Sequence, residues 1–415
     1  MLHLIPFFHA NIQYAEFHPG AAADLVERSY LPTLEFFAAR PELPAVFEYS
    51  GVTLELLAER WPEGIDLLRL LLERGQIELM GGTYANPILP LIPSDHARQH
   101  VARFIAIYDR LFGDLAVPRP QGIFLQEFAY DPSLAPLLEA AGYSYTLLTP
   151  RLLLSGLRQQ LNLSTQPLPA VGPSLAADGP ELLHPLRMSG ARGATLTAFP
   201  MYRELIGLLF DTAYGRKAFD SIADLLRQVD AHAGDVPALL FCGPSDAEFI
   251  GAYAALGKDS LSLDAFARFM QQVWELPFTG SMLPRDYLAA YPPARTVYVP
   301  AGSSERNLDV WTADPDNARL NALCQEAEQK LRLATVLHPE NQLMLQEAWR
   351  AMLLAENSDG RGWTPRPERR LDCYNYALEA IALAEKMLAG IKRPEAGLSA
   401  KDSLLIRRHD DEPSS

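Results

Sequence analysis

Along the first 150 residues, short runs of apolar residues alternate with longer stretches in which apolar residues recur at helical spacing. Short apolar runs predict buried strands, and longer stretches with apolar residues at helical spacing predict helices between them. The predicted strands are residues 4–10, 45–51, 77–82, 122–126 and 143–149, and the predicted helices are 24–40, 54–74, 95–112 and 133–141. Such alternation is typical of a parallel sheet covered by helices, so the expected fold class is α/β.

Weaker strand patterns follow at 195–201, 237–243 and 295–302. Before them, residues 151–190 are rich in Leu, Pro and Ser without a clear period, and we interpret them as an insertion loop with a short helix that borders the site. We therefore expect a barrel domain over 1–300, a helical domain of three helices over 301–391 (at 316–337, 341–356 and 370–391), and a flexible tail over 392–415.

Composition and net charge limit the classes of function that we expect for this protein. Of the 415 residues, 48% are hydrophobic and 21% charged, so a large core is expected, and no run approaches the roughly 20 apolar residues of a membrane span. The net charge of -15 disfavours nucleic acid and anionic membranes as partners. The N-terminus lacks the basic region of a secretory signal, and Cys242, Cys324 and Cys373 are too far apart for a thiolate zinc site. We predict a cytoplasmic protein with reduced thiols and no cofactor; the sequence does not predict an oligomeric state.

One carboxylate stands out. Glu127 follows the apolar run GIFLQ and precedes an aromatic turn. If residues 122–125 form a buried parallel strand, this side chain lies at the carboxyl end of the strand, where barrel enzymes place their reactive groups.

Six segments carry a resemblance to a known family. They are HANIQ (9–13), GQIELMGGTYANPILPLIP (75–93), GIFLQEFAYDP (122–132), FPMYRELIG (199–207), SDAEFIG (245–251) and LLAENSDGRGW (353–363). In order and spacing, the first five resemble the sequence blocks of glycoside hydrolase family 57, the α-amylase and 4-α-glucanotransferase group. The sixth is similar to the motif of its helical domain. The resemblance implies a distorted seven-stranded (β/α) barrel followed by a helical domain that closes the cleft.

The chemistry that this resemblance implies is retaining cleavage of an α-glycosidic bond in α-1,4-glucans or related oligosaccharides. Glu127 matches the glutamate nucleophile, and a second carboxyl about 5 Å away would protonate the leaving oxygen. Tyr202 stands at the family's acid position in the fourth block. Glu204 would share a face with it on a strand, so Glu204 is the candidate general acid.

Further residues are candidates for substrate binding. They are His9, Asn11, Glu78, Tyr84, Asn86, Asp246, Glu248, Trp311, Asp359 and Trp363. Alternatives stay open for several: His9 as a hydrogen-bonded core histidine, Glu78 in a buried ion pair, and Asp246 with Glu248 as helix-capping acids. Trp349 lies among helically spaced apolar residues and is interpreted as core.

Two other functions compete with the glycosidase. One is a catalytically impaired homologue that only binds glycans. The other is a metal-dependent deacetylase or α-mannosidase, which needs an aspartate with two histidines. His96 and His100 have i, i+4 spacing, but their predicted helix lies on the outside, where a solvated face is expected.

Overall fold

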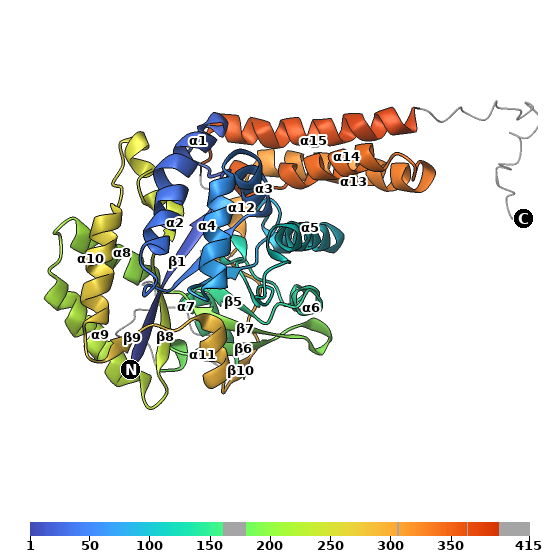
Figure 1. The fold of residues 1–415 in the computed structure, drawn as a ribbon. Coiled ribbons are helices and arrows are strands. Elements are labelled where there is room, and N and C mark those ends of the chain that lie inside the picture. Colours follow the sequence, from blue (N-terminus) through green and yellow to red (C-terminus); the bar gives the residue numbers. More distant parts are fainter. Residues whose placement is uncertain (161–179, 305–306, 363, 390–415) are drawn as a thin grey trace, which may run out of the picture.

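A computed structural model describes residues 1–160, 180–304, 307–362 and 364–389 (Figure 1). Its strands form two sheets. The first has the order β3 (Ile77–Met80), β2 (Ala45–Tyr49), β1 (Leu2–Ala10), β8 (Ala238–Asp246), with β9 (Thr279–Gly280) also paired to β1. The second has the order β10 (Thr296–Val297), β6 (Leu186–Ser189), β7 (Thr195–Pro200), β5 (Tyr145–Leu148), β4 (Gly122–Ile123). All pairings are parallel except β6 with β7.

A parallel bridge between Gly81 and Ile123 connects the two sheets at β3 and β4. The strands therefore follow one another as a curled parallel sheet, which confirms the expected α/β class. Every residue of β1 and β2 is buried, as their apolar runs require when both faces of a parallel sheet are covered. The part of the chain that the structure describes contains ten strands, three of which have only two residues.

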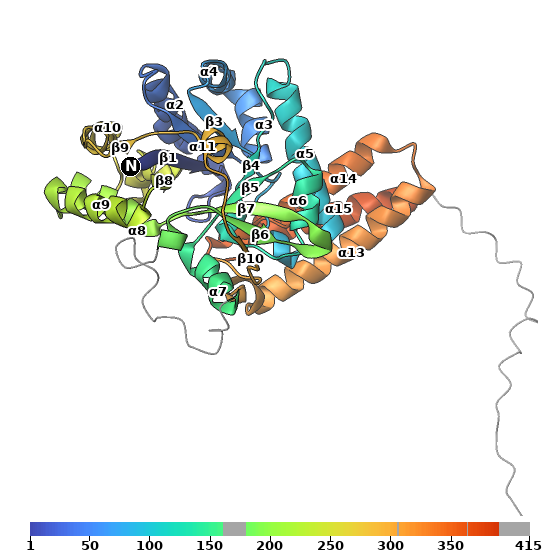
Figure 2. The same ribbon diagram turned by 90° about the horizontal axis from the view of Figure 1, so that it is seen from below.

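Helices cover this sheet (Figures 1 and 2). In the barrel region they are α1 (Ala22–Leu25), α2 (Leu31–Ala38), α3 (Gly51–Arg60), α4 (Pro62–Glu73), α5 (Ser94–Phe112), α6 (Ala135–Ala140), α7 (Pro150–Gln160), α8 (Arg203–Ala213), α9 (Phe219–Ala233), α10 (Leu263–Trp274) and α11 (Pro284–Ala290). Of the expected insertion loop 151–190, residues 161–179 lie outside the described residues. The part before them forms most of α7 and the part after them leads into β6.

Prolines divide two of the helices that the sequence predicts as continuous. The expected helix 54–74 is interrupted at Trp61, and Pro62 begins α4. The expected helix 24–40 contains a π-helical turn, Val26–Tyr30, just before Pro32. A proline has no N–H to donate and its ring clashes with the preceding turn, so it is tolerated in the first turn of a helix and interrupts one elsewhere.

The strand expected at 195–201 is confirmed, but the assumption that residues 202 and 204 also lie on a strand is wrong, with consequences for the site. Strand β7 ends at Pro200, and helix α8 begins three residues later at Arg203. Pro200 cannot donate to the next rung of the ladder, and Leu205, Leu208 and Leu209 are buried at helical spacing. Residues 202 and 204 therefore do not alternate on a strand.

Among the described residues, four helices follow the barrel region: α12 (Asp309–Thr312), α13 (Pro315–Leu337), α14 (Gln342–Ala355) and α15 (Pro367–Leu388). The three long ones match the helices expected at 316–337, 341–356 and 370–391 and lie side by side (Figures 1 and 2). Trp349 of α14 is half-buried and packs against the main core. The expected tail 392–415 lies outside the described residues.

The expectation of a solvated face for His96 and His100 is wrong. Both side chains are fully buried where α5 meets the end of α14. His96 Nδ1 lies 2.6 Å and His100 Nε2 lies 3.1 Å from the carboxylate of Glu356. Burial alone would raise the pKa of Glu356, but the hydrogen bonds and charges of the two histidines lower it to about 2. The C-terminal helices cover this face of α5, so the contacts of His96 and His100 with Glu356 connect these helices to the barrel.

Within the described ranges, no helix combines the length and the hydropathy of a membrane span.

Candidate active site

A cavity of about 670 Å³ opens at the carboxyl ends of β1, β4 and β8. The residues that line it are His9, Tyr14, Ala15, Glu16, Phe124, Gln126, Glu127, Phe128, Arg203, Ile206, Ser245, Asp246, Phe249, Tyr253, Ser304 and Asp359. This is the end of a parallel barrel at which loops can bring reactive side chains together. Four of the lining residues are carboxylates.

Glu127 lies in this cavity on a short turn, Gln126–Phe128, that begins soon after β4 ends. Its side chain is half-buried, and its backbone has a φ of 57° and a ψ of 23°. Phe128 and Ser245, which also line the cavity, have φ values of 53° and 72°. The left-handed region costs a non-glycine residue about 1–3 kcal/mol, and such strain gathers at functional sites. The Glu127 carbonyl accepts a 2.9 Å hydrogen bond from the Ser304 N–H, which holds the turn.

His9, near the end of β1, is a buried cation that lines the same cavity as Glu127. Burial by itself lowers the pKa of His9, but the ion pair of Nδ1 with Glu48, with a further contribution from Asp246, raises it to about 9. Imidazolium therefore predominates at neutral pH. Its Nε2 is buried without a hydrogen-bond partner among the described residues. Since His9 lines the cavity, this N–H is available to a ligand hydroxyl.

Asp246 ends β8 and lies in register with His9 on β1. It is half-buried, lines the cavity, and its Oδ2 accepts a 2.7 Å hydrogen bond from the Tyr14 hydroxyl. The Tyr253 hydroxyl lies 3.0 Å from that of Tyr14, so the two phenols support one edge of the carboxylate.

Glu248 lies behind Asp246 and is fully buried. Its Oε1 accepts hydrogen bonds from the Asn11 N–H, at 2.9 Å, and from the Tyr30 hydroxyl. Burial, with a further contribution from the charge of Asp246, raises the pKa of Glu248 to about 8. Glu248 is therefore largely protonated at neutral pH and supports the loop after β8 as a neutral group.

Glu248→Gln is expected to flatten the dependence of stability on pH. Unfolded chains lose this proton near pH 4.5 and the folded protein near pH 8, so stability falls as pH rises between these values. The amide keeps the acceptor oxygen and does not titrate. The wild type should lose up to about 1.4 kcal/mol per pH unit relative to the variant, as measured by urea unfolding from about pH 5 to 8. Glu16→Gln, on the surface beside Lys258, is the control; parallel curves for wild type and Glu248→Gln would contradict the assignment.

The segment after α14 brings C-terminal residues to the cavity. Asp359 accepts hydrogen bonds from Asn11 Nδ2, at 2.6 Å, and from the Ala15 N–H, at 3.0 Å. The Ser358 N–H donates to the carbonyl of Asn86, which has a φ of 50°. Asp359 thus lines the cavity, while Asn11 and Asn86 are buried supports of the loops around it. Trp363 lies outside the described residues.

Three other candidates lie away from the cavity lining. Glu78 is buried and accepts hydrogen bonds from the Tyr145 hydroxyl and the Arg285 backbone N–H, which stand in place of the side-chain ion pair that the sequence left open. Tyr84 is buried and donates to Glu55. Trp311 is buried in a small apolar cluster with Ile88 and Ala129. Each of these side chains has structural contacts that account for its burial.

Tyr202 and Glu204, the two residues considered for the general acid, are not among the residues that line the cavity. Tyr202 is 2% exposed, and its hydroxyl donates to the Leu182 carbonyl. Glu204 is exposed in the first turn of α8, and Arg203 and Ile206 form the cavity wall there. The prediction that Glu204 shares a face with Tyr202 is wrong, because it required a strand and Glu204 lies in helix α8.

Sequence reasoning did not single out several residues of the site. Glu48, the partner of His9, is an acid within an otherwise apolar strand, which could have marked it. Tyr14 directly follows the first block. Arg203 lies within the fourth block, whereas Ser304 had no signal, since only the tertiary structure brings it to the cavity of Glu127.

The curled parallel sheet gathers carboxylates at the carboxyl ends of its strands, the end at which parallel barrels present side chains to a ligand. The chain belongs to glycosyl hydrolase family 57, whose model matches residues 3–300. In the part of the chain that the structure describes, no group of three or more His, Cys, Asp or Glu is arranged to hold a metal ion.

Relatives agree with this assignment. The chain is 35% identical over 122 residues to alpha-amylase 1 of Dictyoglomus thermophilum, covering 29% of this chain and 17% of that protein. It is 24% identical over 293 residues to a 4-alpha-glucanotransferase of Thermococcus litoralis, covering 71% and 39%. The solved alpha-amylase AmyC of Thermotoga maritima superposes with a TM-score of 0.67 at 12% identity, covering 94% of each chain, which shows the shared fold. The chain spans less than half the length of these two curated relatives.

Proposed function

We propose that this protein is a retaining α-glycosidase or transglycosidase that acts on α-1,4-glucans or related oligosaccharides, with Glu127 as the nucleophile. Family membership and the names of the relatives, alpha-amylase and 4-alpha-glucanotransferase, support the substrate class. The observation that carries the proposal is the position of Glu127: a strained, half-buried carboxylate at the carboxyl end of β4, in a cavity with a second acid.

In the proposed reaction, a carboxylate oxygen of Glu127 attacks the anomeric carbon while the bond to the leaving glycosidic oxygen breaks. That oxygen takes a proton from a second carboxyl group, and a covalent glycosyl-enzyme forms. The second group, now a carboxylate, then removes a proton from water or from a sugar hydroxyl, whose oxygen displaces Glu127. Water gives hydrolysis and a sugar hydroxyl gives transfer.

We assign the second role to Asp246 rather than to Glu204 or Tyr202. Glu204 is exposed on α8 and Tyr202 is buried against Leu182, whereas Asp246 lines the cavity of Glu127. Glu16 pairs with Lys258, and both oxygens of Asp359 accept hydrogen bonds from the Asn11–Ala15 segment. Asp246 has one oxygen held by Tyr14. Its other oxygen has no hydrogen bond to any described residue, so it is open to the leaving glycosidic oxygen.

His9 has a supporting role in this proposal. A permanent imidazolium at neutral pH would donate its Nε2–H to a sugar hydroxyl and would stabilise the carboxylates formed during the reaction. Asp359 and Arg203 complete the polar wall, the first as an acceptor and the second as a donor for hydroxyl groups.

The test is incubation of the wild type with maltooligosaccharides, followed by chromatography of the products and by proton NMR of the new reducing ends. We expect the chain-length distribution to change and the first products to carry the α-anomer. Products that first appear as the β-anomer would contradict the retaining mechanism. Binding without any turnover would favour the catalytically impaired, glycan-binding homologue.

A cytoplasmic location is part of the proposal. It is supported by the three cysteines, which are buried thiols without disulfides, as expected in a reducing compartment.

A further inference from the structure

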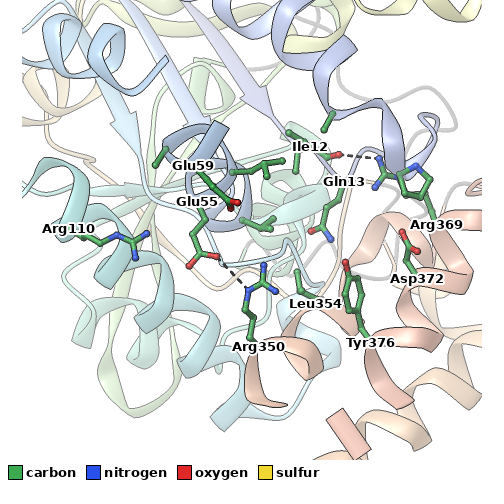
Figure 3. Close-up of a pocket in the computed structure, with 15 residues that line it drawn as sticks. Ile12, Gln13, Glu55, Glu59, Arg110, Arg350, Leu354, Arg369, Asp372 and Tyr376 are labelled. Atoms are coloured by element: carbon green, nitrogen blue, oxygen red, sulfur yellow. Dashed lines mark hydrogen bonds and ion pairs between the residues drawn. The ribbon is translucent and has the colours of Figure 1, made fainter. Parts of the chain in front are cut away.

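A second cavity, of about 620 Å³, lies between the barrel helix α3 and the C-terminal helices α14 and α15 (Figure 3). It shares no lining residue with the cavity of Glu127. The chain segment Ile12–Glu16 separates them: Ile12 and Gln13 face this cavity, and Tyr14, Ala15 and Glu16 face the other. Its volume falls within the roughly 300–1,000 Å³ of small-molecule sites.

The wall of this cavity carries balanced charge. Glu55, Glu59 and Asp372 supply three carboxylates, and Arg110, Arg350 and Arg369 supply three guanidinium groups. An anion would meet the carboxylates and a cation would meet the guanidinium groups, each at an electrostatic cost. A neutral ligand with many hydroxyls fits both sets, because a hydroxyl can accept from a guanidinium and donate to a carboxylate.

Two of the charged groups, Arg369 and Glu55, are held in place before any ligand binds. Arg369 is 6% exposed, and its Nε and Nη2 donate to the carbonyls of Phe17 and Ile12, at 2.9 and 3.1 Å. Glu55 accepts from the Tyr84 hydroxyl at 2.8 Å and lies 3.9 Å from Arg350. Figure 3 shows Glu55 and Arg350 on one side and Asp372 and Tyr376 on the other, with Gln13 between them. Preorganised groups of this kind reduce the entropy that binding costs.

Apolar surface completes the wall. Ile12, Val52 and Leu354 lie among the lining residues, and the half-buried Tyr376 offers an aromatic ring. The C–H face of a pyranose packs against such a ring while its hydroxyls reach the charged groups.

We propose that this cavity is a second binding site for a neutral saccharide, separate from the cavity in which bonds are broken. The choice of an α-glucan unit as the saccharide rests on the proposed function. A bound sugar would contact Gln13, whose amide oxygen accepts a 3.0 Å hydrogen bond from Asn357. The site would thereby hold a glucan chain next to the segment that borders the reactive cavity.

The test is calorimetric titration of maltotriose into the Glu127→Gln protein. Two molecules should bind per chain. In a Glu127→Gln chain that also carries Arg350→Met and Glu59→Gln, one of the two events should weaken about tenfold or more, since hydrogen bonds to charged groups are lost. Glu59 and Arg350 are exposed, the latter by 46%, so the fold should tolerate both changes. Arg227→Met, another exposed arginine with a single ion pair, is the matched control and should leave both events unchanged.

A single maltotriose per chain, or two events unaffected by the double change at 59 and 350, would overturn the inference. So would saturable binding of inorganic phosphate that Arg350→Met abolishes, because the cavity would then be an anion site. Turnover by the wild type is measured separately. Absence of turnover with two binding events would remove the proposed function and leave the second site standing.

Discussion

Glu127→Gln is expected to lower kcat on maltooligosaccharides by roughly 10⁴-fold, with KM changed little, as for loss of a residue that acts only in the reaction. The amide has nearly the shape of the carboxylate but is a poor nucleophile, so the glycosyl-enzyme cannot form. Steady-state kinetics measure the loss. Mass spectrometry of rapidly quenched protein should find a glycosylated peptide containing residue 127 in the wild type and none in the variant.

Glu16→Gln provides the matched control for this experiment. Glu16 lines the same cavity but is 38% exposed and paired with Lys258, so its loss should change kcat less than about tenfold. Circular dichroism and the unfolding temperature of each variant separate a catalytic effect from misfolding. Near-normal turnover by Glu127→Gln would contradict the assignment of the nucleophile, whatever the effect of Glu16→Gln.

Asp246→Asn is expected to lower kcat on maltooligosaccharides by about 10²–10⁴-fold, the usual contribution of general acid catalysis. The loss should depend on the leaving group. An α-maltosyl fluoride releases fluoride, which needs little protonation, so the first step should persist in the variant. A burst of fluoride followed by slow turnover is the expected signature, because the second step still needs a base at position 246.

Glu204→Gln and Tyr202→Phe test the alternative acids in parallel. Glu204 is exposed on α8, so its loss should leave the turnover of maltooligosaccharides and of α-maltosyl fluoride nearly unchanged. Tyr202→Phe removes the hydrogen bond to the Leu182 carbonyl, so a small loss of stability is expected with activity retained. If the leaving-group pattern appeared in Glu204→Gln instead of Asp246→Asn, the assignment of the acid would be wrong.

The strands and the nucleophile candidate could be predicted because their signals are local. The apolar runs at 4–10, 45–51 and 77–82 are buried on both faces, and only a covered parallel sheet favours such runs. Glu127 is recognisable because one carboxylate follows the apolar segment of β4. Its positive φ was not predictable, since nothing in the residues near it requires a left-handed backbone.

The errors have a common origin in contacts between distant segments. Around Tyr202 the local pattern was interpreted as a strand, whereas Pro200 together with the packing of Leu205 and Leu209 favoured α8. His96 and His100 suit a solvated helix face until α14 places Glu356 against them, a partner more than 250 residues away.

By itself the sequence determined the α/β class, the three long C-terminal helices and the turn that carries Glu127, because hydrophobic period and proline position act within a few residues. The tertiary structure alone decided which acids share the cavity of Glu127, and that Glu48 and Glu356 pair with buried histidines. Burial and charge act through space, and residues that meet at the ends of β1, β4 and β8 are separated by more than 100 positions in the chain.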